Sequence, residues 1–339
     1  DFSLLEVVGN EVVEAEQGPS LFQSGSAGAF GAIEIRTPIP SEKSEFRADQ
    51  TVGGNSTFGS LISYSGGSKK FRNMIRVKRY DSKEISAARQ KDGNTEADSH
   101  RFTSLLLKSY FLPSDRVQVV LGASAKSANT DLDRQGLNGL PVDDLNYRVR
   151  TNTARVFAKS RFRLSPDWSQ KLKVQYYQNH RKYQDEVSAS DPVSLGSFQY
   201  RGETIETGWD HQIQLSKITE LHVGLGYFFE RMNREGFDQF TTKAFEWSPY
   251  AHSVFRPQEH WKIEIGAGGS IAQSESKRVS FRGKSSYLIP STGSQFTVGW
   301  AQGVSRPTLF QKFDPTFGNE NLRTQKDTTI DLSFRQSLL

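Results

Sequence analysis

The chain has 339 residues with 43 Lys and Arg against 38 Asp and Glu, and it contains no cysteine. This length allows one large β structure or two ordinary domains, and the missing cysteines exclude disulfides and thiolate metal sites. The two signs of charge are interspersed along the whole chain, which favours a solvated surface or a polar lumen over a nucleic-acid-binding stripe.

Mean hydropathy is −0.59, and the sequence has no run of about 20 apolar residues, so a transmembrane helix is excluded. A transmembrane β-barrel is still compatible with this composition. Its strands need only about 9 to 11 residues, with apolar side chains outside and polar ones inside, and such a pattern averages to a hydrophilic sequence.

The first informative stretch is residues 14–37, EAEQGPSLFQSGSAGAFGAIEIRT. It starts as an acidic strand end, turns at Gly18 and Pro19, passes through a run of small residues, and ends in a short strand that contains Ile33 and Ile35. Small residues let a backbone pass close to another wall. We therefore expect this segment to thread through a tight place.

This stretch resembles the closing segment of the plug domain of TonB-dependent outer-membrane receptors. The matching positions include Gly18, Pro19, Gly31, Ile33 and Ile35. The segment departs from the family pattern at Gln17, Phe30 and Glu34, and the first of these puts in doubt a salt bridge between plug and barrel. A generic glycine-rich β-turn is the alternative interpretation.

After the exit at Pro38 and Pro40, segments with period-two alternation recur, most clearly at 221–229 and 261–271. Apolar residues on one face and small or polar ones on the other are typical of half-buried strands. Short links are expected at 66–70, 112–116, 165–169, 217–220, 256–260 and 289–294, and long polar segments at 82–99, 127–150, 180–207, 231–243 and 305–325. Short turns at one end and long loops at the other are typical of outer-membrane barrels.

Counting from residue 46 to 335, the pattern predicts roughly 14 strands. Transporters with a plugged lumen have about 22 strands. The predicted fold is therefore all-β: an antiparallel transmembrane β-barrel at 41–339 with about 14 of 22 strands present, preceded by the C-terminal remnant of a plug domain at 1–40. On this comparison we expect the chain to be a fragment.

A second signature lies at 299–322, GWAQGVSRPTLFQKFDPTFGNENL. Pro307 is expected to end a strand, and Gly318 with Asn319 to form a tight turn. The stretch resembles the Arg-x-Pro loop and Gly-Asn-Pro-x-Leu turn of TonB-dependent receptors. The matching residues include Arg306, Pro307, Gly318, Asn319, Asn321 and Leu322, whereas Glu320 replaces a proline and Thr324-Gln325 stands in place of Pro-Glu.

The resemblance implies an outer-membrane receptor of a Gram-negative bacterium, monomeric and surrounded by outer-membrane lipid. In the full-length protein it would take up a scarce solute, such as a ferric siderophore or cobalamin, driven by the TonB-ExbB-ExbD complex. It implies no cofactor, no nucleic acid and no enzymatic activity. A passive porin-like channel and a barrel acting as an adhesin or as a phage or partner receptor are the alternatives, and a soluble lectin-like β protein is a more distant one.

Ligand contacts are expected from aromatic residues in or beside the long loops, because aromatics with nearby polar groups suit flat or macrocyclic ligands. The candidates are Tyr183, Phe198, Tyr200, Trp209, Phe237 and Phe240. The alternative is that these residues belong to the membrane-interface girdle or pack loop against loop.

Signals for metals and for catalysis are weak. Residues 92–98, DGNTEAD, alternate oxygen ligands but lack the glycine and terminal Glu of an EF-hand calcium loop, so a solvated acidic loop is preferred and no metal site is predicted. The six histidines are scattered and form no H-E-x-x-H pair. Gly283-Lys284-Ser285 resembles the end of a phosphate loop, but position 278 is Arg rather than Gly.

Overall fold

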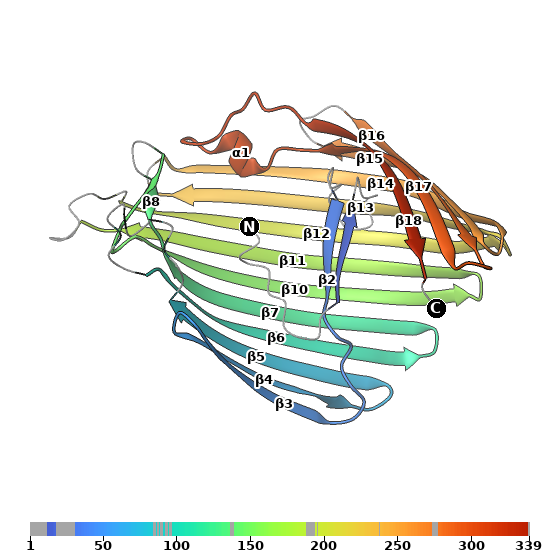
Figure 1. Ribbon diagram of the computed structural model, residues 1–339, viewed down its shortest axis with the longest axis horizontal. Coiled ribbons are helices and arrows are strands. Elements are labelled where there is room, and N and C mark those ends of the chain that lie inside the picture. Colours follow the sequence, from blue (N-terminus) through green and yellow to red (C-terminus); the bar gives the residue numbers. More distant parts are fainter. Residues whose placement is uncertain are drawn as a thin grey trace.

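One large antiparallel sheet forms most of the protein (Figure 1). The structure, a computed structural model, describes residues 12–17, 31–83, 86, 88, 91, 94, 97–135, 139–187, 194, 196–236, 238–272 and 277–337. The sheet has 14 strands in the order β18-β17-β16-β15-β14-β13-β12-β11-β10-β7-β6-β5-β4-β3. Among the described residues no ladder joins β3 to β18, so the curved sheet is not closed.

The strands become long in the middle of the sheet. Their bounds are β3 (Glu45–Gly53), β4 (Thr57–Gly67), β5 (Phe71–Lys83), β6 (Ser99–Ser114), β7 (Val117–Asp131), β10 (Arg148–Ser165), β11 (Trp168–Asp185), β12 (Gly196–Ser216), β13 (Thr219–Glu235), β14 (Phe240–Gln258), β15 (Trp261–Ala272), β16 (Arg278–Ile289), β17 (Ser294–Ser305) and β18 (Gln325–Gln336). The predicted number of strands and the alternation of short turns with longer connections are confirmed.

Three small elements lie outside this sheet. They are the hairpin of β1 (Val12–Gln17) and β2 (Gly31–Arg36), the hairpin of β8 (Arg134–Gln135) and β9 (Pro141–Val142), and the single-turn helix α1 (Leu309–Phe313). The strand predicted around Ile33 and Ile35 is therefore present, as β2, whereas Gly18 and Pro19 lie outside the described residues. The assignment of residues 1–40 to a plug stays a prediction.

Alternate residues of each strand point to the same side of the sheet, and those on the outer side are mostly apolar. On β17 and β18, for example, Val298 and Leu332 are opposite each other and are 54% and 77% exposed. No helix in the described part of the chain is long and apolar enough to cross a membrane.

The inner face is polar. Buried side chains there include Arg76, Lys108 and Glu246, alongside apolar ones such as Met74 and Phe102. Lys108 also ties the segment after β2 to the sheet. Its Nζ donates to the Thr37 carbonyl at 2.9 Å, to Thr37 Oγ1 at 2.8 Å and to the Pro38 carbonyl at 2.8 Å.

Strand β14 carries a proline, Pro249, in its middle. Proline has no N–H to donate to a ladder. The β13–β14 ladder nevertheless runs without a gap from Phe240 to Phe255, whereas the β14–β15 ladder lacks positions 248 and 249. Gly269 of β15 lies beside the proline ring, which is 3.4 Å from where a Cβ of that residue would be.

The prediction of a long loop at 180–207 is wrong. Strand β11 continues to Asp185 and β12 begins at Gly196, and the two pair without interruption down to Trp168 and Ile213. The loops predicted at 127–150 and 231–243 are shorter than expected for the same reason. Polar outward residues such as His180 and Arg201 mark the part of the ladder beyond the apolar band, where a strand no longer shows alternating hydropathy.

Candidate functional site

Aromatic rings gather at the loop ends of β11 and β12. Tyr183 and Phe198 are opposite each other in the ladder, and their rings stack with centroids 4.7 Å apart. Tyr200, two residues farther along β12, lies on the same face and meets both rings nearly at right angles, at 6.2 and 5.9 Å. The period of two thus places three predicted ligand residues in one cluster.

A fourth ring, Tyr147, reaches the cluster from the connection before β10, with its centroid 6.3 Å from that of Tyr183. Burial raises the pKa of the Tyr147 phenol to about 12, because a charged phenolate would lose its hydration there. Tyr147 is therefore partly shielded from water where it meets the cluster.

The return loop, residues 306–324 between β17 and β18, folds back over β13 and β14 (Figure 1). Its helix α1 starts at a capping box, in which the Thr308 hydroxyl accepts from the Gln311 backbone N–H and the Gln311 side chain accepts from the Thr308 N–H. Leu309 is 5% exposed, and the Phe310 ring meets Tyr200 edge-on at 5.7 Å. The return loop thereby joins the aromatic cluster.

A buried carboxylate, Asp314, fastens the return loop to the sheet. It is 3% exposed and accepts a hydrogen bond of 2.8 Å from the Tyr200 hydroxyl and one of 3.4 Å from Nη1 of Arg234. Its Oδ1 also accepts from the backbone N–H groups of Thr316 and Phe317, both at 2.9 Å. A buried charge needs such a set of partners, so these contacts define where the loop sits.

Arg234 completes this arrangement from β13. It is 6% exposed, donates to Thr316 Oγ1 at 3.0 Å, and lies over the rings of Phe198 and Tyr200 at 5.5 and 5.6 Å. A guanidinium over an aromatic face is favourable, particularly when desolvated. The arginine thus bridges the aromatic cluster and the return loop.

The family-like residues of the return loop have identifiable roles. Arg306 pairs with Glu246 of β14, and the Leu309 N–H donates to Glu230 of β13 at 3.4 Å. A Cβ on Gly318 would lie 2.4 Å from the Asp314 carbonyl oxygen, so glycine is required. Asn319 forms the expected turn, since its Oδ1 accepts from the N–H of Asn321 at 3.0 Å.

The remaining family-like and aromatic candidates are placed differently. Pro307 follows the end of β17, and Leu322 is 38% exposed rather than buried. Trp209 lies on the outer face, opposite Leu225 and 47% exposed, away from the aromatic cluster. Phe240 is opposite Arg234 at the start of β14, and Phe237 lies outside the described residues.

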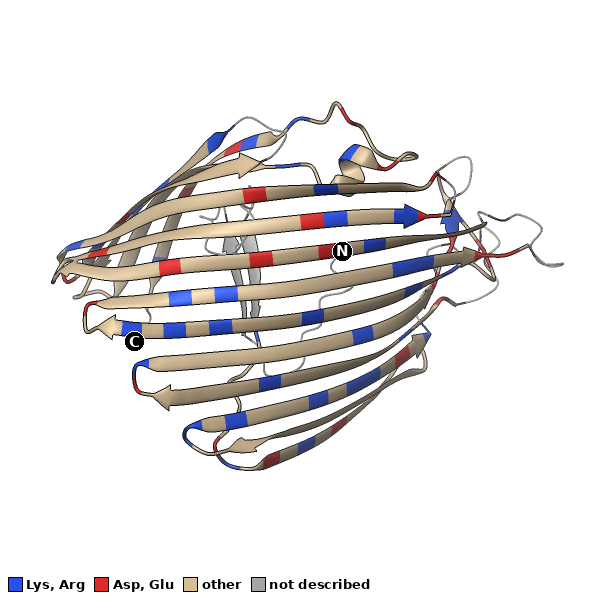
Figure 2. Cartoon of the chain, turned by 180° about the vertical axis from the view of Figure 1, so that it is seen from behind, with Lys and Arg blue, Asp and Glu red and all other residues tan. Residues whose placement is uncertain are grey.

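Positive and negative residues concentrate on different strands of the sheet (Figure 2). On the inner face this gives two walls of opposite charge. The basic wall consists of half-buried or buried inward cations on β5, β6, β7, β10 and β11: Arg72, Arg76, Lys78, Lys108, Lys126, Arg155, Lys173 and Arg181. The acidic wall consists of inward carboxylates on β12 to β15: Glu206, Asp210, Glu220, Glu230, Glu246 and Glu264. The two walls meet where Lys173 and Glu206 form an ion pair of 2.6 Å.

Among the described residues, no group of three or more His, Asp or Glu side chains is arranged to hold a metal ion. Of the acidic segment 92–98, the structure describes Asn94, Ala97 and Asp98, and the Asn94 amide donates to the Ala88 carbonyl at 2.7 Å. Asp92 and Glu96 lie outside the described residues.

The same architecture is found in solved receptor structures. The siderophore receptor PirA from Acinetobacter baumannii has a TM-score of 0.76 at 13% identity, over 96% of this chain and 55% of that one. The copper transporter OprC has a TM-score of 0.78 at 11% identity, over 95% and 55%. The ferripyoverdine receptor of the outer membrane of Pseudomonas aeruginosa has a TM-score of 0.73 at 13% identity, over 96% and 50%.

The chain has the fold of the TonB-dependent receptor barrel. It spans about half the length of the solved structures it matches. No protein-family model matches the chain, and no curated protein does either. The predicted fold class is thus confirmed, at a sequence identity too low to carry a substrate from one protein to another.

Proposed function

We propose that this chain forms a major part of a TonB-dependent outer-membrane receptor for a scarce metal chelate, with a ferric siderophore as the leading substrate. The fold match over 96% of the chain carries this proposal, since the matched proteins are described as siderophore receptors and a copper transporter. The apolar outer face and charged inner face support a location in a bilayer around a polar lumen.

Energised uptake by the full-length receptor would require a plug and the TonB-ExbB-ExbD complex. The glycine-rich segment at 1–40 is proposed as the end of that plug. The three hydrogen bonds from Lys108 to Thr37 and Pro38 support it, because they tether this segment to the inner face of β6. We expect the full-length receptor to act as a monomer, without a cofactor and without catalysis.

The ligand is proposed to contact the aromatic cluster and the return loop. Phe310 and Phe317 of this loop are 39% and 70% exposed, and their rings are 6.3 Å apart and stacked. These two rings extend the surface of the aromatic cluster of Tyr183, Phe198 and Tyr200. The rings of the cluster themselves pack against one another and against Phe310. An exposed pair of aromatic rings backed by a packed cluster suits a flat chelate.

Uptake by the full-length protein tests the function. Growth of a deletion strain, complemented or not, is measured with single metal sources: a panel of ferric siderophores, cobalamin and copper. We expect growth on at least one chelate that needs both this protein and the energising complex. Uptake without the energising complex would indicate a passive channel, and no uptake with retained phage or partner binding would indicate an adhesin-like barrel.

The contribution of the Phe310 and Phe317 rings to chelate binding is tested in the same strain. Phe317→Ala removes the more exposed ring without touching a buried residue, and we expect it to weaken chelate binding about tenfold, the effect of losing one stacked aromatic contact of ~1.5 kcal/mol. Val52→Ala, which truncates another exposed apolar side chain on β3, is the matched control. Equal affinity of the Phe317 variant and the native protein would contradict this site.

A further inference from the structure

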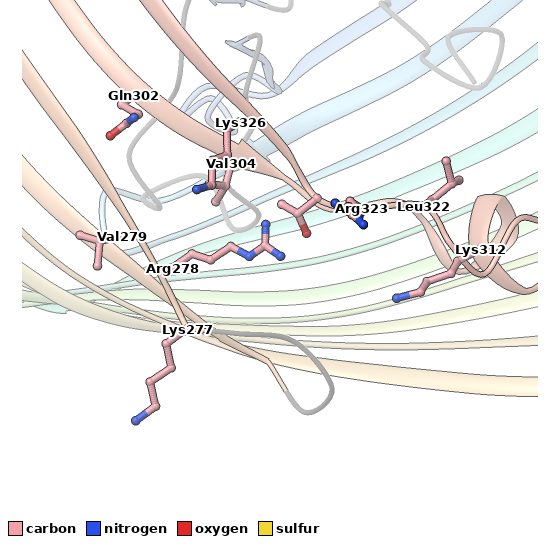
Figure 3. Close-up of a pocket in the computed structure, with 10 residues that line it drawn as sticks. Lys277, Arg278, Val279, Gln302, Val304, Lys312, Leu322, Arg323 and Lys326 are labelled. Atoms are coloured by element: carbon pink, nitrogen blue, oxygen red, sulfur yellow. The ribbon is translucent and has the colours of Figure 1, made fainter.

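Strands β16 and β17 separate at their loop ends. Their ladder stops at Phe281 and Gln302, although β16 begins at Arg278 and β17 continues to Ser305. Over the same stretch β17 stays paired with β18, up to Ser305 and Gln325. The separation leaves a cavity of about 590 Å³, here called the notch, lined by both strands, by α1 and by the segment that leads into β18 (Figure 3).

The notch is strongly basic. Of the ten described residues that line it, five are cationic and none is acidic, and the cations are Lys277, Arg278, Lys312, Arg323 and Lys326. They come from four places in the fold, and Figure 3 shows Arg278 extending from β16 toward the segment that carries Arg323 and Lys326. An anion bound in the notch would be attracted by all five positive charges at once.

The notch lies at the border of the apolar outer face. Along β18 the outward positions are Ile330 and Leu332, 70% and 77% exposed, followed toward the loop end by Thr328 and then Lys326. The opposite residues of β17 are Trp300, Gln302 and, facing Lys326, the buried Val304. Lys326 is thus the first charge beyond the apolar band, at the height where the polar headgroups of a bilayer lie.

We propose that the notch binds a phosphate group, presented either by a lipid headgroup at the membrane surface or by a free phosphate-bearing solute. Arginine offers a planar fork of donors that fits phosphate oxygens, and lysine adds point charges around it. The site differs from the aromatic cluster in place and in chemistry. A lipid headgroup can be the source of the phosphate only if the protein lies in the membrane as proposed above. Binding of a free phosphate does not require that location.

The test uses the full chain in two arms. In the first, inorganic pyrophosphate is titrated into the detergent-solubilised protein by calorimetry. In the second, the protein is placed in nanodiscs of phosphatidylcholine with one fifth phosphatidic acid, and retained lipids are counted by native mass spectrometry. Arg323→Gln combined with Lys326→Gln is the main variant, because both side chains are exposed and their loss leaves the packed return loop intact.

We expect the double variant to weaken binding about tenfold or more in at least one arm, since charge-assisted contacts to phosphate are the strong ones. Loss in the pyrophosphate arm assigns a free solute, and loss of retained phosphatidic acid assigns a lipid. Arg323→Lys should keep most of the affinity. The matched control, Lys69→Gln with Lys217→Gln, removes two exposed lysines from the short turns at the opposite end and should change neither arm.

Two results would overturn the proposal. One is that neither probe binds the native protein more tightly than it binds the double variant. The other is that the control variant loses as much affinity as the double variant, because this would reflect total charge rather than the notch. An unchanged far-ultraviolet circular dichroism spectrum shows that each variant is folded.

Discussion

Removing the charge of Asp314 should release the return loop from the sheet. In Asp314→Asn, the amide oxygen can still accept from the backbone of the loop, but the second oxygen, which takes the Tyr200 hydroxyl at 2.8 Å, becomes an amide nitrogen. Arg234, 6% exposed, then loses the carboxylate to which it donates.

The size of the effect follows from the burial of this pair. Breaking a buried ion pair by removing one partner costs about 3–5 kcal/mol. Arg234 keeps its bond to Thr316 and its place over two rings, so we take the lower value. About 3 kcal/mol corresponds to a roughly hundredfold increase in the population of the opened loop.

Hydrogen exchange measured by mass spectrometry checks this expectation. Peptides covering 306–324 should exchange about a hundredfold faster in Asp314→Asn, while peptides of β10 and β11 should not change. Glu320→Gln is the matched control, because it neutralises an exposed carboxylate of the same loop. Unchanged exchange at 306–324 in the Asp314 variant would refute the role assigned to the buried carboxylate.

Three further changes have defined outcomes. Gly122→Ala should lower the free energy of unfolding by about 1–3 kcal/mol, measured by urea titration, because its Cβ would lie 2.2 Å from the Phe157 ring. Lys108→Gln should speed trypsin cleavage just before Thr37, since three hydrogen bonds to residues 37 and 38 are lost. The absorbance at 295 nm is titrated against pH for the native protein and for Tyr147→Phe. The difference between the two curves should show one phenol ionising near pH 12, in line with the raised pKa of Tyr147.

Each change has its own control or contrary outcome. Gly202→Ala, with nothing within 4 Å of the new methyl group, should leave stability unchanged. Lys126→Gln, whose ammonium lies 4.1 Å from the Phe102 ring, should not affect cleavage before Thr37. Because the pKa of Tyr147 is raised on folding, its stabilising contribution is complete below pH ~10 and is lost toward pH 12. Ionisation of this phenol near pH 10 would contradict its burial.

The sequence was most informative about the apolar outer face of the sheet. Outward residues such as Val298 and Leu332 repeat with period two, so strands and short turns could be predicted without a structure. Beyond the apolar band the ladder of β11 and β12 continues through His180 and Arg201. Backbone hydrogen bonds hold that part together, and they leave no mark in hydropathy.

The site was predictable only in part. Tyr183, Phe198 and Tyr200 were predicted because they are aromatic residues in or beside one long polar stretch, whereas the contact of Asp314 with Tyr200 spans 114 positions. Such a contact depends on the register of several ladders and on the return of a loop, which no local pattern encodes. A local signal for α1 did exist, in the capping box of Thr308 and Gln311.

Pro249 gives the sheet a preferred path for force. On the side of this proline toward Phe240, the described residues of β14 are joined to β15 at Glu246 with Ala272 and at Trp247 with Ile271, while β14 is joined to β13 without a gap from Phe240 to Phe255. Because Glu246 of β14 holds Arg306 while Tyr200 of β12 and Arg234 of β13 hold Asp314, a pull on the return loop enters the sheet through three neighbouring strands. These strands are paired without a gap at this level, so the tension would be shared among them before it reaches the seam between β14 and β15.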